Sequence, residues 1–141
     1  MNQKKAGVRP SILHYQLNNM KKILFVEDEA TLQRTFGDFL RESGYEVISA
    51  TDGEAGLRLA QTQKPDLVLL DLILPKLNGF EILKRLKDNP KTKKIPVIIL
   101  TNLEGINDVD KALELGATTF LVKAHYAPED VVEKVKKALQ E

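Results

Sequence analysis

The sequence predicts an α/β fold: a doubly wound, three-layer (βα)5 sandwich in which helices cover both faces of a parallel sheet. Short apolar segments alternate five times with longer amphipathic segments over residues 21–140. The short segments lack the polar and apolar alternation of a half-exposed strand, so both of their faces are expected to be buried. Right-handed crossovers then place helices on both sides of the sheet and ligands at the carboxyl ends of the strands.

Each element is supported by its own residues. The strands are predicted at Lys21–Val26, Tyr45–Ala50, Asp66–Leu70, Ile95–Leu100 and Thr118–Val122. The helix over 30–44 places Leu32, Phe36, Phe39 and Leu40 on one face, and Gly44 suits its C-terminal end. The helix over 52–63 has Asp52 as its predicted N-cap.

Three more helices follow the third, fourth and fifth strands, over 79–89, 104–116 and 128–140. Pro90 ends the first of them, and Pro128 suits the first turn of the last. That last helix has acids in its first turn and lysines in its last, which the helix dipole favours. The helix over 79–89 is predicted to face the core with Ile82, Leu83 and Leu86. The helix over 104–116 is predicted to do so with Val109, Ala112 and Leu113.

Composition narrows the class of protein. The 141 residues suffice for one domain and include no Cys, which excludes disulfides and thiolate metal sites. No apolar run approaches the roughly 20 residues that cross a bilayer. We therefore expect a cytoplasmic protein that does not bind a membrane.

Residues 1–19 differ from the rest in charge. They contain Lys4, Lys5 and Arg9 and no acid, whereas the remaining residues carry 18 basic and 20 acidic side chains. We interpret 1–19 as a flexible basic leader, which is a tag, a linker or an upstream start, and 20–141 as the folded domain. The charge of that domain argues against nucleic-acid binding, because phosphate contacts need a basic face.

Polar side chains follow four of the five strands at the point where each strand ends. Glu27 and Asp28 follow the first strand, Asp71 the third, Thr101 the fourth and Lys123 the fifth. In this kind of sheet these strand ends meet at one edge. Crowded carboxylates raise each other's pKa unless a cation stabilises them. Lys123 can do this, and so can a divalent ion, for which oxygen ligands beside a phosphate favour Mg²⁺.

This set of residues suits phosphoryl transfer. Asp28 and Asp71 would bind Mg²⁺ directly, with Glu27 holding a coordinated water, and the ion would screen an incoming phosphoryl group. Asp71 is a candidate nucleophile because a carboxylate can form an aspartyl phosphate. Thr101 and Lys123 would contact two phosphoryl oxygens. Each residue alone has a simpler explanation as a cap, turn or surface residue, but their convergence favours a functional site.

These motifs resemble the receiver domains of two-component response regulators. The resemblance covers residues 21–140 and rests on FVEDE, LVLLDLILPKLNGFEIL, VIILTN and GATTFLVKA. It implies a flavodoxin-like fold with strand order 2-1-3-4-5. It also implies Mg²⁺-dependent phosphoryl transfer to Asp71 from a histidine kinase or a histidine phosphotransfer protein. The implied metal ligands are Glu27, Asp28, Asp71 and the backbone carbonyl of Ile73, and the implied switch residues are Thr101 and Phe120.

The resemblance further implies that phosphorylation changes a surface. Thr101 would move toward phosphorylated Asp71, Phe120 would rotate inward, and the face built from 104–116, 118–122 and 128–140 would bind a downstream protein. We expect a stand-alone receiver, monomeric or weakly dimeric, that catalyses only its own phosphorylation and slow dephosphorylation. The alternative is a receiver fragment of a larger response regulator or hybrid histidine kinase.

Three positions depart from the family pattern. Ala124 replaces the usual Pro after Lys123, and a non-proline cis bond costs about 2.5–4 kcal/mol, so we predict a trans bond. Asn102 stands where a small residue is common, which would narrow access to the acceptor or add a hydrogen bond to phosphate. Ile73 and Leu103 are apolar and cannot orient a hydrolytic water, which predicts slow dephosphorylation.

Three other functions fit parts of the sequence. A flavodoxin-like electron carrier needs a hydroxyl- and glycine-rich loop after the first strand, where this chain has EDEAT. A hydrolase of small phosphate esters would use the same Asp, Mg²⁺ and Lys, but a domain this short offers little substrate pocket. A receiver that works without phosphate is disfavoured by the complete set of Glu27, Asp28, Asp71, Thr101 and Lys123.

Overall fold

The computed structural model describes residues 20–140, and in this part of the chain five parallel strands form one sheet in the order β2-β1-β3-β4-β5. The strands are β1 (Lys22–Val26), β2 (Glu46–Ala50), β3 (Leu67–Leu70), β4 (Val97–Thr101) and β5 (Thr119–Val122). The predicted doubly wound parallel sheet and its strand order are thus confirmed. The predicted basic leader, residues 1–19, lies outside the described residues.

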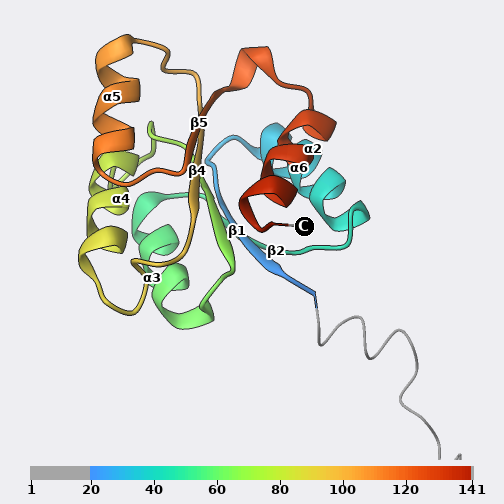
Figure 1. Cartoon of the computed structure of the whole chain (residues 1–141). Helices are drawn as coiled ribbons and strands as arrows, with labels where there is room; N and C mark the ends of the chain where they lie inside the picture. Colours follow the sequence, from blue (N-terminus) through green and yellow to red (C-terminus); the bar gives the residue numbers. More distant parts are fainter. Residues whose placement is uncertain (1–19, 141) are drawn as a thin grey trace, which may run out of the picture.

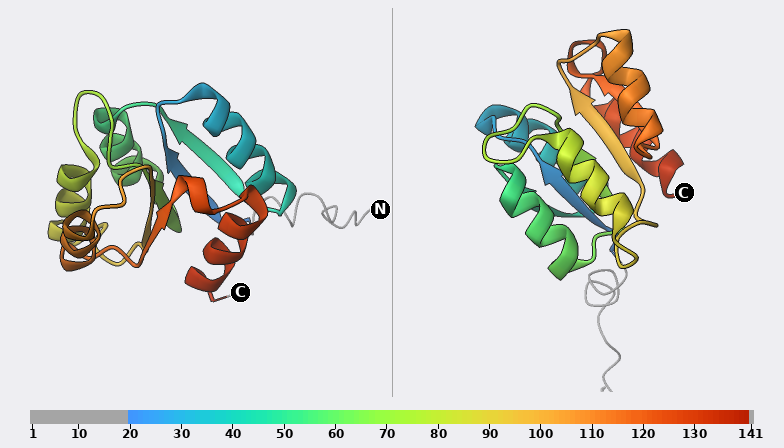
Figure 2. Two further views of the ribbon diagram at one scale, coloured as in Figure 1. Left: turned by 90° about the horizontal axis from the view of Figure 1, so that it is seen from above. Right: turned by 90° about the vertical axis from the view of Figure 1, so that its left-hand side faces the viewer.

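Helices cover both faces of the sheet (Figure 1). One layer contains α3 (Gly53–Gln63), α4 (Gly79–Asp88) and α5 (Ile106–Glu114), and the other contains α2 (Ala30–Glu42) and α6 (Pro128–Ala138). A short 3₁₀ helix, η1 (Lys123–His125), connects β5 to α6. Figure 2, seen from above, shows the sheet between the two helical layers. This is the predicted three-layer sandwich.

Each face of the sheet has its own apolar core. Within β3, Val68 and Leu70 belong to the core under α3, α4 and α5, whereas Leu67 and Leu69 belong to the core under α2 and α6. All four side chains are completely buried. Because both faces need apolar residues, the inner strands β1, β3 and β4 read as continuous apolar runs. The edge strands β2 and β5 are only partly buried, so the expectation that all five strands are buried on both faces is wrong for these two.

The register of the sheet brings the carboxyl ends of four strands to one edge. Val26 pairs with Leu70, and Thr101 pairs with Val122. The residues that continue from these ends are Glu27, Asp28, Asp71 and Lys123. The arrangement of the strands therefore gathers side chains that are up to about a hundred positions apart in the sequence.

Most of the helix predictions are confirmed, with one error. The Asp52 side chain accepts a hydrogen bond from the N–H of Ala55 at 2.8 Å, as its predicted N-cap role requires. In α5, Ala112 is completely buried, but Leu113 is 45% exposed, so the prediction that Leu113 faces inward is wrong. The face of α5 that lies on the sheet is narrow, and the rotation of about 100° from one helical residue to the next turns Leu113 toward solvent.

A close approach of α4 to the end of β3 requires a glycine at position 79. A Cβ on Gly79 would lie 2.3 Å from the carbonyl oxygen of Asp71 and 2.5 Å from the Cα of Leu72. These are backbone atoms of the chain that carries the candidate acceptor, so they have little freedom to move aside. We expect Gly79→Ala to lower the free energy of unfolding in urea by about 1–3 kcal/mol.

The matched control for this prediction is Gly37→Ala in α2. There a Cβ would meet only the flexible side chain of Arg41, whose Nη1 lies at 3.1 Å. Alanine also has the higher helix propensity, by about 1 kcal/mol. Gly37→Ala should therefore leave the stability unchanged or raise it. Equal urea midpoints for Gly79→Ala and the parent would contradict the steric argument.

Candidate functional site

Three carboxylates lie together at the carboxyl edge of the sheet. Glu27 and Asp28 follow β1 and Asp71 follows β3, and one carboxylate oxygen from each lies within 4.8 Å of the others. Glu27 and Asp71 are only 1% and 4% exposed, whereas Asp28 is exposed. The cluster thus has a buried base and one side that is open to solvent.

Lys123 provides a cation for the two buried acids. Its Nζ lies 2.6 Å from Oε1 of Glu27 and 2.8 Å from Oδ2 of Asp71, and its side chain is 8% exposed. Lys123 follows the edge strand β5, from which its side chain reaches the acids beside the central strands β1 and β3. The three carboxylates and one ammonium leave a net negative charge at the site.

Backbone N–H groups hold the remaining oxygens of the buried acids. The N–H of Ile73 donates to Oδ1 of Asp71 at 3.2 Å, and the N–H of Glu29 donates to Oε2 of Glu27 at 2.9 Å. Each buried carboxylate therefore has one oxygen on the ammonium and the other on a backbone donor. Such pairing offsets much of the unfavourable loss of hydration on burial.

Burial and pairing act against each other on the ionisable groups. Burial raises the pKa of the Glu27 carboxyl above its usual range, although hydrogen bonds from Lys123 and Glu29 oppose it. Burial by itself lowers the pKa of the Lys123 ammonium, but the hydrogen bonds to Asp71 and Glu27 together outweigh it, and the net shift is upward. Lys123 is consequently charged at neutral pH, and the site holds a permanent cation.

The donor set fits a hard divalent cation. All three side chains offer carboxylate oxygens, and the nearby ammonium balances only part of their charge. Oxygen ligands of this kind suit Mg²⁺, which usually keeps several of its waters. The solvent-facing position of Asp28 leaves room for those waters. The carbonyl of Ile73 stays a predicted ligand; its residue lies next to the cluster through the N–H bond to Asp71.

We expect Mg²⁺ to stabilise the protein through Asp28. When the free concentration of a ligand is ten times its dissociation constant, a ligand that binds only the folded state raises the free energy of unfolding by about 1.4 kcal/mol. Asp28→Asn should lose most of this gain in thermal denaturation, while Asp38→Asn, an exposed change on α2, should keep it. If Mg²⁺ raised the melting temperature of Asp28→Asn as much as that of the parent, Asp28 would not be a ligand of the ion.

The two predicted switch residues lie on adjacent strands. Thr101 is completely buried, and its hydroxyl accepts a hydrogen bond from the N–H of Leu103 at 3.4 Å. Phe120 is half-buried against the core under α3, α4 and α5, and pairs in register with Ile99. The structure thus places Thr101 at the same edge as the acidic cluster, with its hydroxyl directed to the loop that follows β4.

One residue at the site was missed by the sequence reasoning. The side-chain amide of Gln33, in α2, donates to the carbonyl oxygens of Phe25, Glu27 and Ala50. It therefore joins the ends of β1 and β2 to the turn that carries the acids. A glutamine at this helical position gives no signal in the sequence, because the same residue is common on solvated helix faces.

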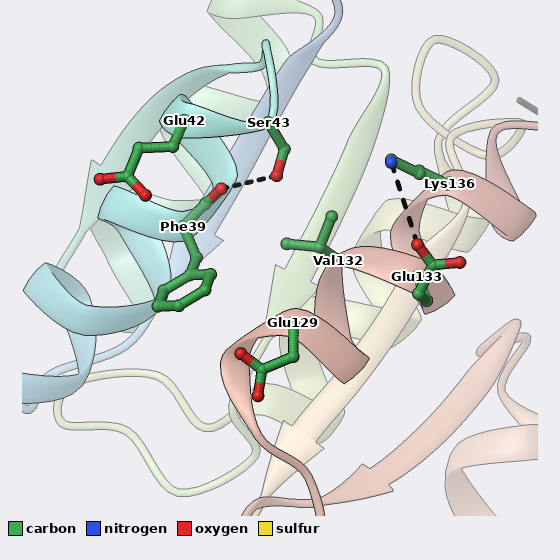
Figure 3. A pocket seen from close by; sticks show the side chains of 7 residues that line it. All are labelled: Phe39, Glu42, Ser43, Glu129, Val132, Glu133 and Lys136. Carbon is green, nitrogen blue, oxygen red and sulfur yellow. Dashed lines mark hydrogen bonds and ion pairs between the residues drawn. The ribbon is translucent and has the colours of Figure 1, made fainter.

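A groove elsewhere on the surface does not belong to this cluster. It has a volume of about 300 Å³ and lies between α2 and α6 (Figure 3). Phe39 and Val132 contribute apolar surface, and the other lining residues are Glu42, Ser43, Glu129, Glu133 and Lys136. None of these residues belongs to the acidic cluster at the edge of the sheet.

The model of the response regulator receiver domain matches residues 23–136. The chain belongs to this family. Family membership makes it a signalling domain of two-component systems and sets aside the electron carrier considered from the sequence. Within residues 20–140, no helix of this receiver domain combines the length and apolar character that crossing a membrane requires.

Curated relatives of the receiver domain are longer proteins. The chain is 41% identical over 120 residues to the alkaline phosphatase synthesis transcriptional regulatory protein PhoP of Bacillus subtilis, covering 85% of this chain and 49% of that protein. It is 40% identical over 102 residues to the response regulator PleD of Caulobacter vibrioides, covering 72% of this chain and 22% of that protein. The chain thus spans about half the length, or less, of these relatives.

Solved structures share the fold of the receiver domain. A CheY-like receiver domain protein from Methanospirillum hungatei superposes with a TM-score of 0.81 at 27% identity, over 86% of this chain and 95% of that chain. The Mn²⁺-bound form of response regulator Rcp1 superposes with a TM-score of 0.72 at 34% identity, over 83% of this chain and 92% of that chain. The second of these structures contains a divalent metal.

Proposed function

We propose that this receiver domain accepts a phosphoryl group on Asp71 in a Mg²⁺-dependent reaction. The observation that carries the proposal is the contact of Asp71 with the ammonium of Lys123, at 2.8 Å, within a cluster that holds two further acids. The ammonium offers a partner for phosphoryl oxygens. The three acids offer oxygen ligands for a divalent ion.

The donor is proposed to be the phosphohistidine of a histidine kinase or a histidine phosphotransfer protein. An oxygen of Asp71 attacks phosphorus, an O–P bond forms, and the P–N bond to the donor imidazole breaks. Lys123 then pairs with a phosphoryl oxygen in place of the Asp71 oxygen that it now contacts. When bound, Mg²⁺ held by Glu27, Asp28, Asp71 and the Ile73 carbonyl would neutralise charge on the transferred group.

Thr101 is proposed to respond to this charge. Its hydrogen bond with Leu103 measures 3.4 Å, which is longer than the usual range of about 2.7–3.2 Å. The hydroxyl accepts in that bond, whereas it would donate its own hydrogen to a phosphoryl oxygen, and hydrogen bonds to ionised groups are about twice as strong as those between neutral groups. The hydroxyl would move toward Asp71, and Phe120 would turn into the space that it leaves.

The output surface is proposed to be the face formed by α5, β5 and α6. On α5, Ile106 is 76% exposed and Leu113 is 45% exposed, and the two lie seven residues apart, on one side of the helix. These two exposed apolar side chains suit contact with a downstream protein. The same surface would serve a stand-alone receiver, a weak dimer or a receiver joined to further domains.

The proposal is tested by intact mass after incubation with acetyl phosphate and Mg²⁺. We expect one added phosphoryl group, its absence when EDTA is present during the reaction, and its removal by hydroxylamine, which cleaves acyl phosphates. An adduct that forms equally well in EDTA would contradict the metal requirement. No adduct under any condition would favour a receiver that acts without phosphate.

Once phosphorylated, the domain is expected to lose its phosphoryl group slowly, over minutes or longer. Ile73 is 55% exposed and adjoins Asp71, so a polar side chain there is tolerated and would reach a water near the acyl phosphate. Ile73→Asn should shorten the half-life several-fold, whereas Ile73→Leu should not. The decay of the adduct followed by mass decides this. A parent half-life of seconds would refute the expectation.

A further inference from the structure

We propose that Gln33 is a positioning residue for the divalent metal: it holds the turn that directs Asp28 toward the ion. The inference rests on the Mg²⁺ site of the proposed function and adds a residue from α2 to it. Gln33 does not contact the metal in this proposal. It acts through the backbone of Glu27.

The amide of Gln33 lies where three segments meet. Its Nε2 lies within hydrogen-bond distance of the carbonyl oxygens of Phe25 at 2.9 Å, of Glu27 at 3.1 Å and of Ala50 at 3.1 Å, and because the amide has two hydrogens, one of them is shared between two carbonyls. The carbonyl of Ala50 also accepts the N–H of Glu27 at 2.9 Å. One side chain of α2 thus ties the end of β1, the end of β2 and the first residue of the acidic turn together.

Glu27 is held through all of its polar atoms. Its N–H bonds to Ala50, its Oε1 lies against the ammonium of Lys123, and its Oε2 accepts the N–H of Glu29. Within residues 20–140, the hydrogen bond that its carbonyl accepts comes from Gln33. The carbonyl belongs to the peptide plane that joins Glu27 to Asp28, so Gln33 sets the orientation of that plane.

The orientation of that plane matters for Asp28. Asp28 is exposed, so neighbouring side chains constrain it less than Glu27 and Asp71, which are buried. The direction of its Cα–Cβ bond follows from the peptide before it. Glu27 and Asp71 are fixed by Lys123, but the third member of the cluster depends on the backbone for its position. Outer groups that orient metal ligands typically change metal affinity by about 10–100-fold when they are removed.

The oxygen of the Gln33 amide also bears on the role of its nitrogen as a donor. Among the described residues, the Oε1 of Gln33 is buried and has no hydrogen-bond partner. A buried acceptor without a protein partner is unfavourable and needs an explanation, such as a functional constraint on the rest of the side chain. Here the nitrogen of the same amide contacts three carbonyls.

The test compares Mg²⁺ affinity in Gln33→Met, which keeps the length of the side chain and removes its donor, with that of the parent. Mg²⁺ is titrated into the metal-free protein, and the dissociation constant is taken from backbone amide shifts in NMR spectra. We expect an increase of about tenfold or more. Gln33→Asn is the second variant, for use if Gln33→Met does not fold. It keeps an amide but shortens the side chain, so that the amide no longer reaches the Glu27 carbonyl, and it should also raise the dissociation constant for Mg²⁺.

A matched control separates positioning from general stability. Phe36→Leu lies on the same helix and disturbs the edge-to-face contact of Phe36 with Phe25, whose ring centroids are 6.4 Å apart. It should lower the melting temperature and leave the Mg²⁺ dissociation constant within twofold. An unchanged dissociation constant in folded Gln33→Met or Gln33→Asn would overturn the proposal. An equal loss of affinity in Phe36→Leu would overturn it as well.

These experiments distinguish a failure of the Gln33 proposal from a failure of the proposed phosphorylation of Asp71. A parent protein that binds Mg²⁺ but takes up no phosphoryl group would refute phosphorylation of Asp71, while the Gln33 variants would still decide the positioning role. A phosphorylated parent with equal affinities in all variants would refute the role of Gln33 alone. A parent that binds no Mg²⁺ would overturn both.

Discussion

Asp71→Asn is expected to abolish uptake of the phosphoryl group from acetyl phosphate. The amide has nearly the shape of the carboxylate but lacks the negative oxygen that attacks phosphorus. The variant should fold, because Lys123 keeps its contact with Glu27 at 2.6 Å and the core under β3 is unchanged. The parent should gain one phosphoryl group by intact mass, and the variant should gain none.

The control for this prediction is Asp88→Asn. Asp88 is an exposed acid at the end of α4, paired with Lys84 at 2.8 Å, and it takes no part in the cluster. Its replacement should leave both the extent and the rate of phosphorylation unchanged. If the folded Asp71→Asn variant still gained the mass of a phosphoryl group, the acceptor would be another residue.

Lys123→Met is expected to lower the free energy of unfolding by about 3–5 kcal/mol at pH 7 in EDTA. Removing one partner of a buried ion pair leaves an uncompensated buried charge, and here two carboxylates lose their cation together. Methionine keeps much of the aliphatic length of the lysine, so the loss is mainly electrostatic. Urea denaturation of the metal-free proteins measures the difference.

The deficit of Lys123→Met should shrink as the pH falls. Burial already raises the pKa of Glu27 above its value in the unfolded chain, and loss of the ammonium raises it further. A carboxyl whose folded pKa is raised favours the folded state below its unfolded pKa, and this advantage is lost as the pH rises through the folded pKa. The difference in free energy of unfolding between the parent and Lys123→Met should therefore become smaller as the pH is lowered from neutral toward the usual pKa of Glu.

An exposed pair serves as the control for Lys123. Lys84 contacts Asp88 at 2.8 Å, but the two side chains are 57% and 65% exposed. Surface pairs contribute about 0–1 kcal/mol, so Lys84→Met should change stability little at either pH. Similar losses in the two variants, or a loss in Lys123→Met that does not depend on pH, would refute the view of Lys123 as the cation of a buried acidic site.

Much of the fold was predictable from the order of residues. Apolar runs without alternation indicate strands buried on both faces, as β1, β3 and β4 are. The N-cap Asp52 and the first-turn proline Pro128 mark where two of the helices begin. Parallel strands place their carboxyl ends at one edge, so the polar residues that follow them had to meet there. For the same reason the sequence named Glu27, Asp28, Asp71 and Lys123 as neighbours.

The tertiary structure alone decided which atoms touch. Periodicity does not say how wide a contact a helix makes, so it predicts that Leu113 faces the core although this side chain is 45% exposed. The role of Gly79 follows only from the close approach of two backbone segments, and that of Gln33 only from its contacts with two strands and with the turn after β1. Such contacts join different elements of the fold, and a local pattern of apolar and polar residues does not indicate them.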